Sequence, residues 1–471
     1  MAIAIGIGIG LNRSKSTSWT TRQLAAGLKV INDGTTLGWY DASDDTTITK
    51  DGANLVSLWK DKLLSGRDFA QADDNFKPIK KELNYHFGEI SGGGIMFAGT
   101  DEYMKVILTA AQPFNIYVTY RHHTAQVASD PMLNAKDPIF SYFRFVVQPV
   151  GKYSLYLGTG WCGETNILFN NYFGTTHMKA DGVNSFIKVN RVIGDVGSGG
   201  NNGFTSLEMG GSTVYAKYGH YEIVEMIIRG NDTDIQAEAV KQYLNVKNFD
   251  VFSKGKILLT FDGNRENIYN QAFPILVEEG VKGTMYTYGG GVGTVGAYTW
   301  ANTLEMYNAG MDIQCHSFTH PGLETQTDEE IIAEMENNNA AFIANGLPSP
   351  EHIAYPFAAL SLNTQNIVKN YRKSGRRTEI VDFKVMWRRY MHQYSIHSYP
   401  IENITAPNLV ILKSYMDFVA LNGSYITLYH HFTNAADAAG LATFREIITY
   451  GKSIGLEFVT ISQLYNQIAH L

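Results

Sequence analysis

The alternation of hydrophobic and polar positions divides the 471-residue chain into two parts of different character. From Leu37 to about residue 230, short stretches of alternating apolar and polar residues are interrupted by Gly, Asp or Asn at intervals of roughly ten residues. One example is Phe114-Asn-Ile-Tyr-Val-Thr-Tyr120 and another is Phe140-Ser-Tyr-Phe-Arg-Phe-Val-Val147. Short strands at this spacing predict an all-β sandwich.

From Gly255 onward, apolar strand patterns alternate with amphipathic helical patterns. We expect strands at 256–261, 283–288, 311–315, 352–355, 425–429 and 458–461, and helices at 267–279, 300–309, 327–345, 362–373, 441–454 and 462–469. Repeated strand–helix units predict an α/β fold in which a parallel sheet forms a distorted (β/α) barrel. The functional site of such a barrel lies at the carboxyl ends of its strands.

These patterns place an arm and linker at residues 1–34, the sandwich at 35–250 and the barrel at 251–471. The first residues repeat Ile-Gly, with no basic residue before the apolar run and no small-x-small cleavage site after it. We therefore expect no signal peptide, and the run is too short to span a bilayer. The repeat is typical of an extended arm that pairs with another segment or chain.

Composition narrows the functional classes. The net charge is -7 and no basic stripe is present, so we expect no nucleic-acid partner. Two cysteines, Cys162 and Cys315, do not make a disulfide framework. They form either a single long-range pair or two free buried thiols, and we expect the free thiols. The aromatic content of 12% suits either a sugar-binding surface or an aromatic core.

Candidate metal ligands follow two of the predicted barrel strands. Asp262 comes directly after the run from Lys256 to Phe261, and His316 and His320 follow the run from Met311 to Cys315. Imidazole and carboxylate are the usual ligands of zinc and similar ions, and a His-x-x-x-His pair can share one ion. We do not count Cys315 as a ligand, because the side chain next to His316 on a strand points the other way.

The N-terminal part resembles the concanavalin-A-like (laminin-G-like) jelly-roll modules of phage and bacterial surface proteins. The resemblance rests on Gly38-Trp-Tyr-Asp-Ala-Ser-Asp44, Leu55-Val-Ser-Leu-Trp-Lys-Asp61, Phe97-Ala-Gly-Thr-Asp101 and Glu222-Ile-Val-Glu-Met-Ile-Ile228. Such a module is either a glycan-binding surface or a spacer whose aromatics form its core. The aspartates of Asp41-Ala-Ser-Asp44 suit either a calcium site or a turn.

The C-terminal part resembles the polysaccharide deacetylase superfamily, the chitin-deacetylase-like carbohydrate esterases. The matching segments, in order, are Leu259-Thr-Phe-Asp262, His316-Ser-Phe-Thr-His320, Ile353-Ala-Tyr-Pro-Phe357, Tyr371-Arg-Lys-Ser-Gly-Arg376 and Ile426-Thr-Leu-Tyr-His430. They extend over the whole of the predicted barrel.

The resemblance implies metal-dependent removal of acetyl groups from an acetylated polysaccharide, with zinc as the expected metal. It gives His316 and His320 the role of metal ligands, and Asp262 that of the base that takes a proton from water. His430 would be the acid that protonates the departing amine. Tyr355, Pro356 and Phe357 would form the substrate side, with the N–H of Phe357 donating to the oxyanion.

Two departures from the family pattern bear on activity. The family has two successive carboxylates where this chain has Asp262-Gly263, so either Asp262 is the base and the metal lacks a carboxylate, or Asp262 binds metal and the base is missing. Asn264 would share a face with Asp262 if the strand continues. Ala354 replaces an arginine that orients the base in many members, and Arg376 or Arg377 is either a substitute or a surface residue.

We therefore expect a deacetylase of N-acetylated capsule or cell-wall polysaccharide, extracellular or associated with a phage or prophage tail. Homo-oligomers such as trimers, or assembly into a virion, are compatible with that setting. One alternative is a glycan-binding or receptor-binding structural protein without turnover, which a lost metal carboxylate would predict. Another is an O-acetyl esterase, because esters are easier electrophiles than amides.

Overall fold

A computed structural model of the protein describes residues 18–468, with gaps. The gaps are residues 82, 85–90, 123–129, 137–141, 148–152, 158–160, 166–172, 190–191, 194–195, 198–199, 201–202, 213–216, 219, 250, 379–392, 403 and 433–437. The described chain divides into two compact units, Ser18–Asp250 and Val251–Leu471. The predicted Ile-Gly arm lies outside the described residues.

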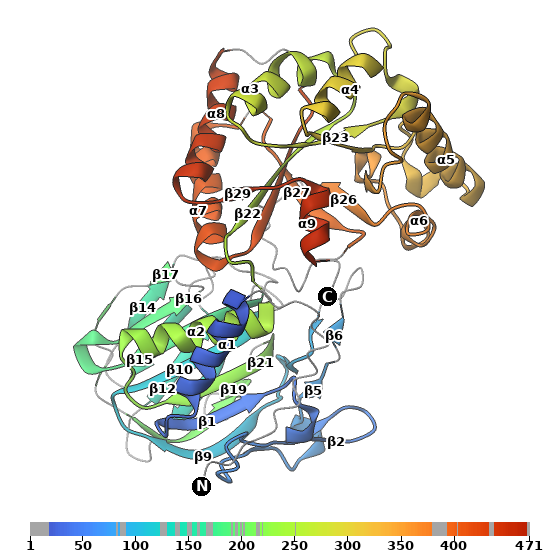
Figure 1. The fold of residues 1–471 in the computed structure, drawn as a ribbon. Coiled ribbons are helices and arrows are strands. Elements are labelled where there is room, and N and C mark those ends of the chain that lie inside the picture. The colour runs from blue at the N-terminus through green and yellow to red at the C-terminus, as the bar shows by residue number, and fades with distance from the viewer. Residues whose placement is uncertain are drawn as a thin grey trace. The chain divides into compact units, whose positions relative to one another are not determined.

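Antiparallel strands of the first unit form the predicted sandwich of two large sheets (Figure 1). The first sheet contains β1 (Thr36–Asp41), β5 (Ile79–Lys80), β8 (Ile95–Ala98), β10 (Phe114–His122), β15 (Phe173–Ala180), β16 (Phe186–Val189), β17 (Val192–Ile193) and β21 (His220–Arg229). The second contains β2 (Ile48–Lys50), β3 (Val56–Trp59), β4 (Phe69–Ala70), β9 (Met104–Ala110), β11 (Asp130–Lys136), β12 (Tyr142–Val147), β13 (Tyr153–Leu157), β14 (Trp161–Thr165) and β18 (Phe204–Met209). Two short ribbons pair β6 (Leu83–Asn84) with β7 (Ser91–Gly92) and β19 (Gly211–Ser212) with β20 (Lys217–Tyr218).

Alternation along the strands explains why the two sheets pack together. In β9, every second residue from Met104 to Ala110 is buried, and the residues between them are exposed. The buried side chains of both sheets form one core that includes Tyr40, Trp59 and Phe97. Among the described side chains of the sandwich, the exposed large apolar residues include no aromatic one. For these residues the structure favours the aromatic-core interpretation over an aromatic sugar-binding surface.

Helices cover the other face of the first sheet. Helix α1 (Ser18–Ile31) begins within the region predicted as arm and linker, and α2 (Asp234–Phe249) follows the last strand of the sandwich. The two helices pack on each other and bury Tyr117 and Ile227 of the first sheet (Figure 1). Part of the segment predicted as a linker is therefore helical, because the apolar residues Leu24, Leu28 and Ile31 give it a face that packs on α2 and the sheet.

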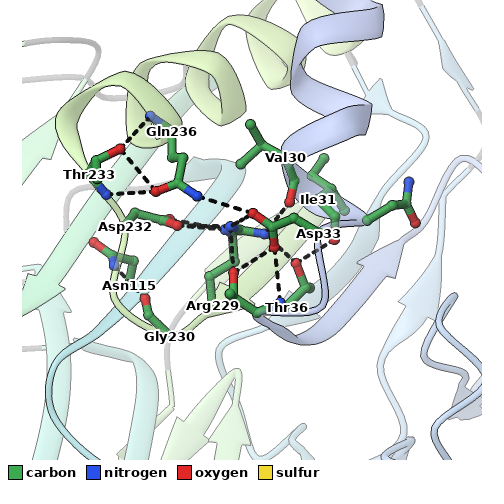
Figure 2. A network of polar contacts seen from close by, with 12 residues as sticks. Val30, Ile31, Asp33, Thr36, Asn115, Arg229, Gly230, Asp232, Thr233 and Gln236 are labelled. Carbon is green, nitrogen blue, oxygen red and sulfur yellow. Dashed lines mark hydrogen bonds and ion pairs between the residues drawn. The ribbon is translucent and has the colours of Figure 1, made fainter.

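A buried arginine fastens α1 and α2 to the sheet (Figure 2). Arg229, at the end of β21, donates to the carbonyl of Val30, to Thr36 and to the carboxylates of Asp33 and Asp232. Because a buried charge is costly without partners, this set of bonds specifies how the helices dock.

The Asp41 segment is a turn stabilised by lysine. Ser43 N–H donates to the carboxylate of Asp41 at 3.0 Å, and Thr46 N–H donates to that of Asp44 at 3.2 Å. The ammonium group of Lys62 lies 2.9 Å from Asp41 and 3.1 Å from Asp44. Since this cation already occupies the space between the two carboxylates, the turn interpretation fits better than a calcium site.

The second unit is the predicted barrel of parallel strands surrounded by helices (Figure 1). Its strands are β22 (Lys256–Asp262), β23 (Thr284–Thr287), β24 (Asp312–Cys315), β25 (His352–Ala354), β26 (Ser374–Thr378), β27 (Ile396–Pro400) and β28 (Tyr425–His430), and β29 (Glu457–Phe458) adds to β22. Strand β22 pairs with both β23 and β28, which closes the barrel. Leu258, Tyr286 and Tyr425 fill its interior.

The predicted helices of the barrel are present close to their expected ranges. The strands β26 and β27 and the helix α7 were not predicted. A single π-helical turn (Ile268–Ala272) leads into α3 (Phe273–Glu278), followed by α4 (Trp300–Asn308), α5 (Asp328–Ala344), α6 (Leu362–Val368), α7 (Ala406–Asn422), α8 (Ala438–Ser453) and α9 (Ile461–Ile468). The predicted capping box is present, with Thr327 and Glu330 bonding to each other's backbone. Within the described part of the chain, no helix is long and apolar enough to cross a membrane.

Candidate active site

Asp262 is a buried carboxylate at the carboxyl end of β22. One of its oxygens, Oδ2, forms an ion pair with Arg376, and the other, Oδ1, has no hydrogen-bond partner among the described residues. Burial raises the pKa of Asp262, but the charge of Arg376 and the hydrogen bond from it, with the charge of His431, outweigh burial and hold the pKa below its ordinary value. The group is therefore an ionised carboxylate with one oxygen free to accept a proton.

The sequence left undecided whether Arg376 substitutes for the missing arginine or lies on the surface. It is buried on β26, donates to Asp262 and Ser398, and its guanidinium carbon lies 5.2 Å from the ring centres of both Tyr286 and Tyr429. Ala354 is its register partner on β25. Since partners in a parallel pair share a face, the small side chain of Ala354 leaves room for the guanidinium of the neighbouring strand.

His316 and His320 form the predicted pair. His316 directly follows β24, and its Nδ1–H donates to the carbonyl of Ala354 at 2.8 Å, which leaves the Nε2 lone pair free. The two Nε2 atoms are 3.1 Å apart. Burial lowers the pKa of His316 to about 3 and also lowers that of His320, so both rings are neutral at neutral pH. Cys315 points away into an apolar cluster on the other face of the strand, as expected.

A buried carboxylate from α5 shapes the loop between these histidines. Glu334 accepts hydrogen bonds from the N–H groups of Phe318 and Thr319 at 2.6 and 2.7 Å, and from the hydroxyl of Thr319. His320 N–H donates to Ser317 Oγ at 3.0 Å. Four donors of the loop are thereby fixed, which orients both imidazoles before any ligand arrives.

Two adjacent histidines, His430 and His431, lie at the end of β28. His430 is the register partner of Phe261, and its ring centre lies 3.9 Å from that of Phe432 at an interplanar angle of 32°. Its Nδ1 also lies 3.7 Å from Glu402 Oε1. Burial lowers the pKa of His430 to about 4. One residue further, His431 lies on the same side of the strand as Tyr429 and Asp262.

His431 forms a dyad with Glu402, which follows β27. Its Nδ1 lies 2.7 Å from Glu402 Oε1, and its backbone N–H donates to the same oxygen. Burial lowers the pKa of His431, but the hydrogen bond and charge of Glu402, with the charge of Asp262, outweigh burial and raise the pKa above the ordinary value. His431 therefore carries a proton under conditions where His316, His320 and His430 do not.

The segment predicted to bind substrate has two different parts. Tyr355 is buried, and its ring packs against Gly375. Phe357 is 75% exposed, and its ring centre lies 4.7 Å from that of His320. Pro356 is buried between them. Among the described residues no acceptor engages the N–H of Phe357, so this donor is available at the rim of the barrel.

Gly263 and Asn264 replace the second carboxylate with a different structure. Gly263 has φ +85, and the side chain of Asn264 bonds to the backbone of Tyr288 through both its oxygen, at 3.2 Å, and its nitrogen, at 2.7 Å. Because both ends of the amide are already used, Asn264 is not available as the substitute metal ligand that its position allowed.

Unfavourable backbone conformations gather at this end of the barrel. Among the described non-glycine residues of the barrel, positive φ occurs at Ser317, His320, Phe357, Ala358 and Phe432, all in segments that follow the carboxyl ends of the barrel strands, whereas Asn54 and Leu64 are the described cases in the sandwich. Each such residue costs on the order of 1–3 kcal/mol and persists only where the surroundings enforce it, which is typical of functional sites.

The residues fit a divalent cation in part. Two nitrogens that are each about 2.0–2.1 Å from one zinc ion at a tetrahedral angle lie about 3.3 Å apart, close to the separation of the two Nε2 atoms. Asp262 Oδ1, buried and without a partner among the described residues, supplies a nearby acceptor. However, the described residues contain no group of three or more His, Cys, Asp or Glu side chains arranged to hold an ion. The two imidazoles would therefore supply two of the ligands of such an ion.

Comparison with known proteins finds similarity in the C-terminal half of the chain. Residues 250–374 match the sequence profile of the polysaccharide deacetylase family. A putative polysaccharide deacetylase of Bacillus subtilis, YxkH, is 25% identical over 141 residues, which is 30% of this chain. The chain spans about half, 50%, of the length of that curated relative.

Solved structures with a similar fold include the Xyl-CE4 domain of a multidomain xylanase from the hindgut metagenome of Trinervitermes trinervoides. It is 19% identical, with a TM-score of 0.35, and the match covers 46% of this chain and 91% of that one. A family 4 carbohydrate esterase from Streptomyces lividans, solved in complex with acetate, is 17% identical with a TM-score of 0.32, covering 43% and 90% of the two chains.

Sequence reasoning missed four residues that shape this site. Glu402 and His431 were overlooked because β27 was not predicted and because His430 occupies the position of the family motif. Glu334 lies in the middle of a helix, where a glutamate normally faces solvent, and only its burial reveals its role. Tyr288 carried a weak signal, since it ends an apolar strand and precedes three glycines.

Proposed function

We propose that the barrel hydrolyses acetyl groups from an N-acetylated surface polysaccharide. One observation carries this proposal: Asp262 is held ionised by Arg376 with its second oxygen free, at the rim where the His316–His320 pair and the His431–Glu402 dyad also lie. Such a set supplies a base, an electrophile site and an acid, which are the groups that hydrolysis of an amide requires.

Asp262 acts as the base. Its Oδ1 accepts a proton from the attacking water, while Arg376 keeps Oδ2 fixed and keeps the carboxylate ionised until the proton arrives. A divalent cation bound by His316 and His320 would polarise the acetyl carbonyl and lower the pKa of a water molecule bound to it. The N–H of Phe357 donates to the oxyanion that forms at the carbonyl oxygen.

His431 acts as the acid. An amide nitrogen cannot leave as an anion, so it must be protonated as the C–N bond breaks. His431 is the histidine of the site whose pKa is raised, and Glu402 holds its Nδ1 so that Nε2 carries the transferable proton. This assignment differs from the His430 of the family motif, because His430 Nδ1 accepts the N–H of Phe432 at 2.8 Å, lies farther from Glu402 at 3.7 Å, and belongs to a ring whose pKa burial lowers to about 4.

The test is acetate release from a panel of N- and O-acetylated glycans, with added zinc and with chelator. We expect release that chelator abolishes and that falls strongly in a His316→Ala/His320→Ala variant. His431→Gln and His430→Gln are a matched pair of changes at adjacent histidines, and we expect the larger loss of kcat for His431→Gln. A larger loss for His430→Gln would return the acid role to His430.

Two other functions have specific support. A site with two imidazole ligands and Gly263 in place of a carboxylate favours weak metal affinity, which suits a glycan-binding protein without turnover. Release from O-acetylated glycans alone would indicate an esterase, because an ester needs less activation than an amide. No release from any substrate, with no metal retained on purification, would contradict the hydrolase and favour the binding function.

We further propose that the protein works outside the cell or on a virion tail, where the sandwich is a module of the concanavalin-A-like type. Support comes from the resemblance of the sandwich segments to such surface modules and from the match of residues 250–374, which follow them in the chain, to the polysaccharide deacetylase family. Detection of the chain in purified virions or in the culture medium would test this setting, and recovery only from the cell interior would contradict it.

A further inference from the structure

Tyr288 is an aromatic side chain beside the histidine pair that the proposed reaction does not use. It follows β23 and is half-buried, and its ring centre lies 5.2 Å from that of His320 at an interplanar angle of 54°. The ring is therefore close to the position where the acetylated residue of a substrate must bind.

The ring occupies this place because Gly291 lacks a side chain, and Gly263 adjoins its other edge. A Cβ at Gly291 would lie 1.9 Å from Tyr288 Cε2, and a Cβ at Gly263 would lie 4.0 Å from Cε1. Any larger side chain at 263 would extend toward the exposed edge of the ring, and its φ of +85 also favours glycine. Gly263 thus does more than remove a carboxylate, since it leaves the edge of Tyr288 open toward the site.

Phe357 is a second aromatic ring in contact with His320. Its backbone has φ +57, which is unusual for a bulky residue, and its side chain is 75% exposed at a ring distance of 4.7 Å from His320. Glycine would adopt this backbone without strain, and a polar side chain would be better solvated. The physical cost of placing a phenyl ring here indicates that the ring has a ligand.

The backbone that presents Tyr288 is held rigidly. Asn264 bonds to both the N–H and the carbonyl of Tyr288, and Asn338 of α5 accepts the N–H of Gly289 at 2.7 Å. Gly290 N–H donates to the carbonyl of Phe318 at 2.9 Å, which ties this loop to the histidine loop. A preorganised aromatic surface binds a ligand with little loss of conformational freedom.

We propose that Tyr288 and Phe357 form an aromatic patch that binds the pyranose ring of the acetylated sugar through its apolar C–H face. The proposal rests on the proposed function, because it takes the substrate to be a glycan. Sugar rings present such faces, and aromatic side chains with a few polar groups are the usual lining of ligand sites. The patch assigns Tyr288 and Phe357 to substrate specificity and explains why a glycine at 263 suits this chain.

The test compares Tyr288→Ala, Tyr288→Phe and Phe357→Gly, the last of which keeps the backbone conformation and the N–H while removing the ring. Tyr307→Ala is the matched control, because Tyr307 is a surface tyrosine of α4 that is 40% exposed. Binding of a tetrasaccharide of N-acetylglucosamine and of acetylated xylan is measured by calorimetry. Hydrolysis of both glycans and of p-nitrophenyl acetate, an ester without a sugar, is measured separately.

We expect Tyr288→Ala and Phe357→Gly to weaken glycan binding tenfold or more, and Tyr288→Phe and Tyr307→Ala to bind as the unaltered protein does. Where the protein turns over, the loss of kcat/KM should be at least tenfold greater for glycan than for p-nitrophenyl acetate. Unchanged affinity in Tyr288→Ala, or an equal loss in Tyr288→Phe and Tyr288→Ala, would overturn the proposal, as would absence of binding to either glycan by the unaltered protein. Glycan binding without any hydrolysis would refute the proposed reaction while leaving the aromatic patch supported.

Discussion

Arg229 in the sandwich and Arg376 in the barrel are both fully buried arginines paired with buried aspartates. Arg229 donates through Nε to Asp232, through Nη1 to Val30 and Thr36, and through Nη2 to Asp33 and Thr35. All three nitrogens of its guanidinium are engaged. Its acidic partner Asp232 also accepts from the hydroxyl of Tyr117 at 2.7 Å.

Arg376 is satisfied less completely. It donates to Asp262 and Ser398, but its Nε and the Oδ1 of Asp262 have no hydrogen-bond partner among the described residues. The rings of Tyr286 and Tyr429 lie against the guanidinium and do not substitute for an acceptor. A complete set of partners fixes a fold, whereas an incomplete set keeps an atom available for water or substrate.

The largest effect that this comparison predicts is on stability. Replacing Arg229 by Met leaves Asp33 and Asp232 without their cation, and we expect the first unit to lose about 3–5 kcal/mol of unfolding free energy. Hydrogen exchange in peptides of β21 and α2 would measure the loss. Arg445→Met is the control, since Arg445 is 41% exposed, and it should cost no more than about 1 kcal/mol. A stable Arg229→Met sandwich would show that the two arginines do not differ in the way described.

The next effect is on catalysis. Asp262→Asn keeps an oxygen for Arg376 but removes the base, so we expect kcat for acetate release to fall by about 10²–10⁴-fold. Asp232→Asn is the matched change in the sandwich, and it should lower stability more than Asp262→Asn while leaving kcat per folded molecule unchanged. The free energy of unfolding and kcat would be measured for both variants. The same ratio of stability loss to activity loss in the two would contradict the difference described here.

A smaller effect concerns the histidine loop. Glu334→Ala releases three donors of the loop between His316 and His320, and we expect zinc affinity to fall about 10–100-fold. Equilibrium dialysis against zinc measures this directly, without reliance on turnover. Glu336→Ala is the control, because Glu336 is exposed on the same helix. Equal zinc affinity in the two variants would mean that the loop holds its shape without Glu334.

The smallest effect is on pH dependence. The acid must be protonated, and Glu402 is a main reason that the pKa of His431 lies above its ordinary value near 6.5. Glu402→Gln removes that charge, so the alkaline limb of the kcat profile should move to lower pH by about one unit. Glu446→Gln, on the surface of α8, should leave the profile in place. An unmoved limb in Glu402→Gln would remove His431 from the acid role.

The two domains also differ in how far the sequence predicts them. Alternation along strands such as β9 and the unbroken apolar run of β22 follow directly from burial on one face or on both, and the fold class predicted from them is confirmed. The strand β26 was missed because its sequence, Ser-Gly-Arg-Arg-Thr, is polar. Its Arg376 points into the barrel toward the carboxylate of Asp262 rather than toward water. Helix α7 was missed because apolar residues such as Val410 and Ile411 are exposed on it, which blurs the helical pattern.

The site was predictable where a strand end delivers the residue and not where a distant element supports it. The histidine pair and Asp262 lie where the strand pattern and the family motif placed them. Their roles in catalysis remain predictions. Glu334, Glu402 and Arg376 act through contacts between elements far apart in the chain, and no local pattern records which side chain a helix or a neighbouring strand will bring.

The pairing of Ala354 with Arg376 has a consequence for engineering and for judging related chains. An alignment read column by column counts Ala354 as a defect and Arg376 as unremarkable, although together they keep one guanidinium beside Asp262. The two positions are therefore epistatic: Ala354→Arg alone would force a second guanidinium into occupied space, whereas Ala354→Arg with Arg376→Ala would move the same charge one strand across the barrel. Whether a related chain has lost this arginine must therefore be judged from both positions together, because either one can place a guanidinium beside Asp262.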